Sequence, residues 1–253
     1  MGLFKKKGLD NETMKNGAKL ITLARPQSVI SEQFRNIRTN ISFMNVDKEI
    51  KTIAFTSAMA SAGKSTVSDN VAITMAQAGK KTILIDADLR RPTLHATFNV
   101  PNTKGLTTLL TSKDLDAKSV TRPSGVENLD ILVAGPIPPN PSELLGSKHM
   151  LDLIENLKND YDMVVIDLAP VLDAAETQQL TSSLDGTIFV VRQGHTQKAA
   201  VKRAVQMMKL TQSPILGYVM NDVGEDGDGG YGYGYGYGYG YGYGYGEEDK
   251  KGK

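Results

Sequence analysis

The sequence of 253 residues contains no cysteine, so disulfide bonds and thiol chemistry are excluded and a reducing compartment is permitted. No apolar run approaches the ~18 residues that a membrane-spanning helix needs, and no hydrophobic stretch of a secretory signal follows the first lysines. A charge excess is missing as well, since the net charge is only +1. We therefore expect no nucleic-acid partner and no membrane-spanning segment.

The remaining composition is ordinary for a globular protein, with 40% apolar and 23% charged residues. A chain of this length fits a single α/β domain with tails. Residues 1–26 are polar and rich in lysine. We interpret them as a basic flexible N-terminal segment, which is either a solvated disordered arm or a contact for an anionic membrane surface.

Residues 27–223 carry the patterns of regular secondary structure. Apolar side chains recur at helical spacing in residues 27–48, which predicts a helix. Short β-branched runs then alternate with helical stretches, which predicts an α/β fold with a mostly parallel sheet flanked by helices on both faces. The predicted strands are Thr52–Thr56, Thr82–Asp86, Leu129–Val133, Met163–Asp167, Thr187–Val191 and Ile215–Met220. The predicted helices are Lys64–Ala78, Ser147–Leu157, Ala174–Ser182 and Gln197–Leu210.

A phosphate loop, residues 57–66, joins the first predicted strand to a helix and ends in Gly-Lys-Ser-Thr. A glycine before a helix lets backbone N–H groups face a phosphate, and the helix N-terminus adds partial positive charge. Lys64 can reach the β- and γ-phosphates, and Ser65 can hold Mg²⁺. The pattern G-x-x-x-x-G-K-[ST] is incomplete, because position 58 is alanine. The predicted nucleotide site consists of Ser61, Ala62, Gly63, Lys64, Ser65 and Thr66.

Two further predicted strands end in aspartate. Asp86 and Asp88 close one strand and Asp167 closes another. Ligands of parallel sheets bind at the carboxyl ends of the strands, and Mg²⁺ is usually held by one or two carboxylates together with phosphates. We predict Asp86 and Asp167 as metal ligands and Asp88 as a base toward an incoming hydroxyl. Arg90 and its neighbour Arg91 are candidates to neutralise charge on a transferred phosphate.

Together these segments resemble the bacterial tyrosine kinases of capsule and exopolysaccharide systems, which have the P-loop NTPase fold and are related to chromosome- and septum-positioning ATPases. The phosphate loop is similar to the family's Walker A motif, Ile83–Pro92 to its Walker A′ motif and Val164–Pro170 to its Walker B motif. Pro138–Leu145 after Gly135 is similar to another family signature. The resemblance covers residues 27–223, a P-loop kinase domain.

The resemblance implies a protein-tyrosine kinase that uses ATP and Mg²⁺. Lys64, Ser65 and Thr66 would bind the phosphates and the metal. Asp86 and Asp167 would organise the metal, and Asp88 would help to deprotonate a tyrosine. The late segments with Arg192 and Asn221 would complete the nucleotide site, with Asn221 near the adenine.

The resemblance also implies partners. Glu32, Arg35 and Arg38 resemble the family's oligomerisation helix, residues 27–48 here, which implies a ring-like homo-oligomer. Such kinases usually need the cytoplasmic end of a transmembrane polysaccharide co-polymerase. Since this chain has no membrane segment, it resembles the split form, a cytoplasmic protein held at the inner face of the plasma membrane by a separate activator. A tyrosine phosphatase is expected to reset it.

Two positions depart from the family pattern. Ser61 replaces a glycine of the phosphate loop, so its Cβ is expected to strain the backbone there. Leu168-Ala169 replaces the Thr-Pro that follows the Walker B aspartate, which removes a hydroxyl near the metal. Lys64 and the three aspartates are kept.

Residues 224–253 are a low-complexity tail in which tyrosine alternates strictly with glycine. Glycine at every second position disfavours a strand, so we predict a disordered, flexible tail. Such a tail is either an aromatic low-complexity segment or, behind a kinase domain, the substrate. Each phosphate would add about −1.5 to −2 charges between acidic flanks and so favour release of a docked tail. The predicted phosphoacceptors are Tyr231, Tyr233, Tyr235, Tyr237, Tyr239, Tyr241, Tyr243 and Tyr245.

Two alternative functions stay open. A positioning ATPase usually has a second lysine early in the phosphate loop, and residues 57–62 contain none. A weakly active nucleotide-binding scaffold of the same polysaccharide system is compatible with Ser61 and Leu168. Autophosphorylation of the tail, with regulation of capsular or exopolysaccharide synthesis and export, is the interpretation that the sequence favours.

Overall fold

The computed structural model describes residues 9–44, 49–112 and 115–224, with side chains from Thr13 onward. The chain divides after Val223, and the residues before this point form one compact unit. The eight predicted phosphoacceptor tyrosines lie outside the described residues. Across the described ranges, no helix has both the length and the hydrophobicity that crossing a bilayer requires.

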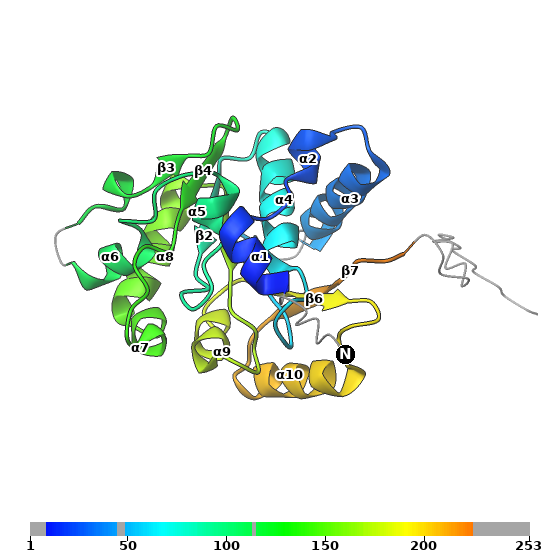
Figure 1. The fold of residues 1–253 in the computed structure, drawn as a ribbon. Helices are drawn as coiled ribbons and strands as arrows, with labels where there is room; N and C mark the ends of the chain where they lie inside the picture. Colours follow the sequence, from blue (N-terminus) through cyan, green and yellow to red (C-terminus); the bar gives the residue numbers. More distant parts are fainter. Residues whose placement is uncertain (1–8, 45–48, 113–114, 225–253) are drawn as a thin grey trace, which may run out of the picture. The chain divides into compact units, whose positions relative to one another are not determined.

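A seven-stranded sheet organises the first unit (Figure 1), in the order β3-β4-β2-β5-β1-β6-β7. Every strand pair is parallel except β3 with β4. The mostly parallel sheet predicted from the sequence is confirmed, and only the short β3 was not predicted. The strands are β1 (Thr52–Thr56), β2 (Thr82–Asp86), β3 (Arg122–Pro123), β4 (Leu129–Leu132), β5 (Met163–Asp167), β6 (Gly186–Arg192) and β7 (Ile215–Asn221).

Helices cover both faces of the sheet, as predicted. On one face the apolar side chains of α3 and α4 pack on alternate residues of the central strands, and on the other face α6, α7, α8 and α9 pack on the residues between them. The long helices are α3 (Val29–Met44), α4 (Lys64–Gln77), α8 (Lys148–Asp160) and α10 (Lys198–Leu210). The shorter helices are α1 (Leu9–Asn16), α2 (Ile21–Ala24), α5 (Leu94–Thr97), α6 (Leu106–Thr111), α7 (Pro141–Leu145) and α9 (Ala175–Thr181), with a 3₁₀ turn at Ala117–Ser119.

Residues 9–26 differ from the flexible arm that the sequence predicts, because they form α1 and α2 and pack on the domain. The buried amide of Asn70 on α4 accepts hydrogen bonds from Thr22 and donates one to the carbonyl of Lys19. Gly17 ends α1 with φ +77°, and a Cβ there would lie 2.5 Å from the backbone of Thr97. The segment is poor in apolar residues, so its hydrophobic pattern did not predict that it packs on the domain. Polar hydrogen bonds and one close backbone approach hold it there instead.

Strand register brings the acidic strand ends together. In the pairing of β2 with β5, Asp86 lies directly opposite Asp167. The strand β1, which leads into the phosphate loop, pairs with the other side of β5. The three predicted motifs therefore meet at one edge of the sheet, at the carboxyl ends of neighbouring strands.

Candidate active site

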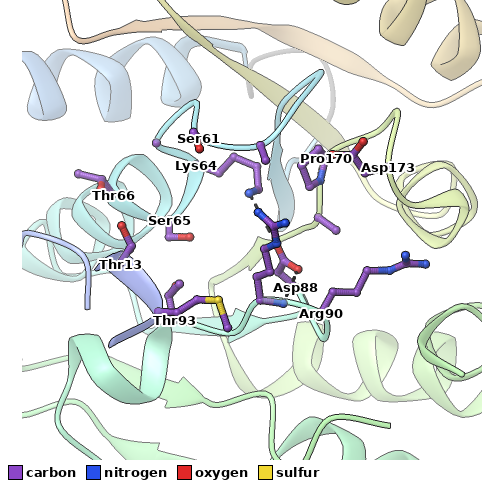
Figure 2. Close-up of a pocket in the computed structure, with 15 residues that line it drawn as sticks. Thr13, Ser61, Lys64, Ser65, Thr66, Asp88, Arg90, Thr93, Pro170 and Asp173 are labelled. Carbon is purple, nitrogen blue, oxygen red and sulfur yellow. Dashed lines mark hydrogen bonds and ion pairs between the residues drawn. The ribbon is translucent and has the colours of Figure 1, made fainter. Parts of the chain in front are cut away.

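A cavity of about 310 Å³ lies at this edge (Figure 2). It is lined by the phosphate loop and the first turn of α4, by residues between Asp88 and Thr93, and by residues between Ala169 and Asp173. Thr13 and Met14 of α1 add a wall that the sequence analysis missed. The predicted residues that line the cavity are Ser61, Gly63, Lys64, Ser65, Thr66, Asp88, Arg90 and Arg91. Ala62, Asp86, Asp167, Arg192 and Asn221 adjoin these residues without lining the cavity.

The backbone of the phosphate loop turns through left-handed conformations. Ser61 has φ +65°, so the strain expected from its side chain is present, and Gly63 has φ +89° at the N-terminus of α4. Behind the loop, the Asn221 side chain donates to the Ala62 carbonyl at 2.9 Å, and an Arg192 nitrogen lies 3.4 Å from the Ser61 carbonyl. Both residues support the loop, and a contact of Asn221 with adenine stays a prediction.

Gly63→Ala is expected to destabilise the protein. A Cβ at this position would lie 2.1 Å from Nδ2 of Asn221, and the left-handed backbone alone costs about 1–2 kcal/mol for a non-glycine residue. The melting temperature measured by calorimetry should fall. In an Asn221→Ala background the same substitution should cost less, because the clash is gone. An equal cost in both backgrounds would contradict the close packing of Asn221 on the loop.

Two contacts join the phosphate loop to the aspartates. Nζ of Lys64 lies 3.5 Å from Oδ2 of Asp88, with both side chains almost fully buried. Figure 2 shows these two side chains pointing toward one another. The Ser65 hydroxyl donates to Oδ2 of Asp167 at 2.5 Å. The structure thus brings the predicted ammonium, hydroxyl and carboxylates into one cluster.

Asp86 and Asp167 form a buried acidic pair whose surroundings suit a cation. Burial, with repulsion from Asp167 and Asp88, raises the pKa of Asp86 to about 8. Burial also raises the pKa of Asp167 to about 6, although Lys64 and the Ser65 hydroxyl favour its charged form. Oδ2 of Asp86 accepts the backbone N–H groups of Thr93 and Leu94, whereas Oδ1 of Asp86 and Oδ1 of Asp167 are buried with no hydrogen-bond partner. A divalent cation would satisfy both oxygens and relieve the repulsion.

The donor set matches Mg²⁺ rather than a metal held by protein alone. Within residues 9–44, 49–112 and 115–224, no three His, Asp or Glu side chains are grouped so that they could hold a metal by themselves. Mg²⁺ commonly uses one or two carboxylates, keeps several waters and takes its other ligands from phosphates. Asp86, Asp167 and the Ser65 hydroxyl fit that role.

Sequence reasoning missed a further buried carboxylate, Asp69. It lies four residues after Ser65 on α4, hence on the same side of the helix, and is 1% exposed. Burial, followed by repulsion from Asp167 and Asp86, raises its pKa well above the ordinary value. The four-residue spacing from Ser65 was the signal that could have revealed it.

Arg90 lines the cavity as predicted, but its guanidinium is paired with another side chain of the domain. Its Nε donates to Oε1 of Glu176 at 2.8 Å, and Figure 2 shows its side chain extending away from Lys64. This pairing does not support a direct role for Arg90 in neutralising a transferred phosphate. The reason is Glu176, a buried carboxylate at the start of α9 that draws the guanidinium toward itself.

The predicted oligomerisation residues make contacts within the chain. Arg35 bonds to Glu32 and to the Pro26 carbonyl, and Arg38 donates to the Thr74 carbonyl on α4. The Arg38 contact ties α3 to α4, and the Arg35 contacts stay within α3 and the residues just before it. Self-association through α3 stays a prediction.

Comparison with known proteins places the fold and the family of the chain. The AAA domain family matches residues 50–215, which include the phosphate loop and all three motif aspartates. The tyrosine-protein kinase YwqD of Bacillus subtilis is 44% identical over 202 residues, 80% of this chain and 85% of the relative. The kinase domain of the Escherichia coli tyrosine kinase ETK has a TM-score of 0.79 at 31% identity, over 86% of this chain and 85% of that structure. The chimerical protein CapA2B2 has a TM-score of 0.76 at 36% identity, over 83% of this chain and 97% of that structure.

Proposed function

Because this chain belongs to the bacterial tyrosine-protein kinase family, we propose that it transfers the γ-phosphate of ATP to tyrosines of its own C-terminal tail. The observation that carries the proposal is the cluster of Lys64, Ser65, Asp88 and Asp167 at the mouth of the phosphate loop. The tail supplies eight tyrosines in one short segment of the same chain.

Lys64 and Asp88 have different roles in phosphoryl transfer: Lys64 binds the phosphates, and Asp88 accepts the phenol proton. The phosphates of ATP compete with Asp88 for the ammonium of Lys64, so ATP binding leaves the carboxylate to accept a proton. The phenol oxygen then forms a bond to the γ-phosphorus, the bond to ADP breaks, and the phenol proton passes to Asp88. Lys64 and the N-terminus of α4 stabilise the negative charge on the phosphates.

Ser65, Asp86 and Asp167 would hold Mg²⁺, which would neutralise negative charge on the phosphates when bound. The Ser65 hydroxyl would exchange its bond to Asp167 for the metal. The replacement of the usual Thr-Pro by Leu168-Ala169 leaves this set intact, because Leu168 is buried and points its side chain into the core.

The cellular role is proposed from the family resemblance. We assign the chain to the regulation of capsular or exopolysaccharide synthesis and export. A transmembrane polysaccharide co-polymerase would activate it at the inner face of the membrane, a phosphatase would reset the tail, and ring-like self-association would present each tail to a site.

A variant with all eight tail tyrosines changed to phenylalanine tests the proposal. With Mg·ATP and the activator's cytoplasmic peptide, the wild-type chain should become labelled on phosphotyrosine, and the variant should lose nearly all label while it still binds ATP. Tyr218→Phe is the matched control, because Tyr218 is 69% exposed but lies on the domain. Phosphate release without labelling of the wild type would favour the positioning-ATPase alternative, and nucleotide binding without turnover would favour the scaffold.

A further inference from the structure

Three segments distant in sequence meet at the carboxylate of Glu176. It lies in the first turn of α9 and is only 1% exposed. Arg90 reaches it from the loop after β2, with Nε 2.8 Å from Oε1 and Nη2 3.4 Å from Oε2. Ser142 reaches it from α7 and donates to Oε2 at 2.7 Å. The last contact gives the Pro138–Leu145 signature a physical role that sequence reasoning did not supply.

The carboxylate of Glu176 is held in its charged form. Burial alone raises the pKa, but hydrogen bonds from Ser142, from its own backbone N–H and from Arg90 together hold the pKa of Glu176 below its ordinary value. A buried charge that loses its partner is strongly unfavourable. Moving Arg90 from Glu176 to a phosphate would therefore cost free energy.

The contact of Arg90 with Glu176, called the tether below, acts on the loop after β2, which carries the proposed base Asp88. Arg90 follows Asp88 by two residues, and Oδ1 of Asp88 accepts the backbone N–H of Arg91 at 3.1 Å. The far end of the loop is fixed where Thr93 and Leu94 donate to Asp86. Between these points, Leu89 is buried in the core and the Arg90 side chain reaches α9.

The partners of the tether are themselves closely packed. A Cβ at Gly146, at the end of α7, would lie 2.6 Å from Oε1 of Gln179 on α9. This approach brings α7, which carries Ser142, close to α9, which carries Glu176.

We propose that Glu176 is a positioning residue for phosphoryl transfer: with Ser142 it anchors Arg90 and so holds the Asp88 loop against Lys64. The inference rests on the proposed function and deepens it. It assigns Arg90 to the orientation of the base, not to contact with the transferred phosphate.

A mutant cycle of Glu176→Gln, Arg90→Ala and the double variant tests the inference, with two readouts. Glu176→Gln should lower kcat for tail phosphorylation by about 10- to 100-fold with nucleotide affinity nearly unchanged, because the phosphate loop is not touched. The double variant should be no slower than Arg90→Ala alone, since both remove the same tether. Hydrogen exchange should rise in peptides that span residues 87–93 and not across the sheet. Glu143→Gln, on the exposed side of α7, is the matched control and should change neither readout.

Three results would overturn the inference: unchanged kcat in Glu176→Gln, rate losses that multiply in the double variant, or exchange that rises uniformly through the domain. A wild-type chain that releases phosphate but labels no tyrosine would instead defeat the proposed function. The mutant cycle would then be read on phosphate release and on the exchange of residues 87–93, so the two failures remain distinct.

Discussion

Lys64→Met is expected to reduce phosphoryl transfer to tyrosine by about 10³-fold, the size of effect seen when a charge-stabilising donor is removed from a dry site. The Lys64 side chain is 10% exposed and lies 3.5 Å from Asp88, so its ammonium faces the cavity and not the solvent. Methionine keeps the length and the apolar part of the side chain while removing the charge. ATP affinity should fall as well, which titration calorimetry would measure.

Lys80→Met is the matched control, because Lys80 is exposed and lies beyond the C-terminal end of α4. This variant should keep both activity and nucleotide affinity. Circular dichroism and melting temperature should show that Lys64→Met remains folded. Tyrosine phosphorylation that survives in folded Lys64→Met would remove the phosphate loop from the mechanism.

Asp88→Asn should lower kcat by about 10²- to 10³-fold while leaving ATP affinity the same or higher. The amide keeps the size of the side chain and still accepts the Arg91 backbone N–H, but it cannot take the phenol proton. It also ends the competition with phosphates for Lys64. A kcat loss together with retained affinity separates a base from a phosphate ligand, and single-turnover kinetics would measure it.

Asp152→Asn, on the exposed face of α8, is the control for the loss of one carboxylate and should behave as wild type. If Asp88→Asn instead weakens ATP binding and leaves kcat unchanged, Asp88 belongs to the nucleotide site and the proton goes elsewhere. That result would also weaken the role given to Glu176, because its tether would then position a different function.

The sheet and the position of the site follow from local sequence patterns. Near-continuous apolar runs marked six of the seven strands, and motifs directly after three of them had to converge because parallel strands end at one edge. To predict that Asp86 lies opposite Asp167, only the correct strand order was needed in addition. The two-residue β3 is too short to leave a pattern.

The direction of single side chains could not be read from sequence. Arg90 follows an acidic strand end and was therefore predicted to face the phosphate, but it is drawn to Glu176, more than eighty residues later in the chain. Likewise, residues 9–26 looked like a solvated arm because the anchor for α2 is a buried asparagine on a different helix. Both outcomes depend on tertiary contacts between polar groups, which no local periodicity records.

The central claim is that the phosphate loop and the paired strand-end aspartates hold one metal–nucleotide complex. A crystal structure of the chain with Mn²⁺ and a non-hydrolysable ATP analogue tests it directly, since anomalous scattering locates the ion. We expect the phosphates on the backbone of Gly63–Thr66, and the ion beside Ser65 with Asp86 and Asp167 bound to it directly or through water. A nucleotide bound elsewhere, or carboxylates turned away from its phosphates, would contradict the account.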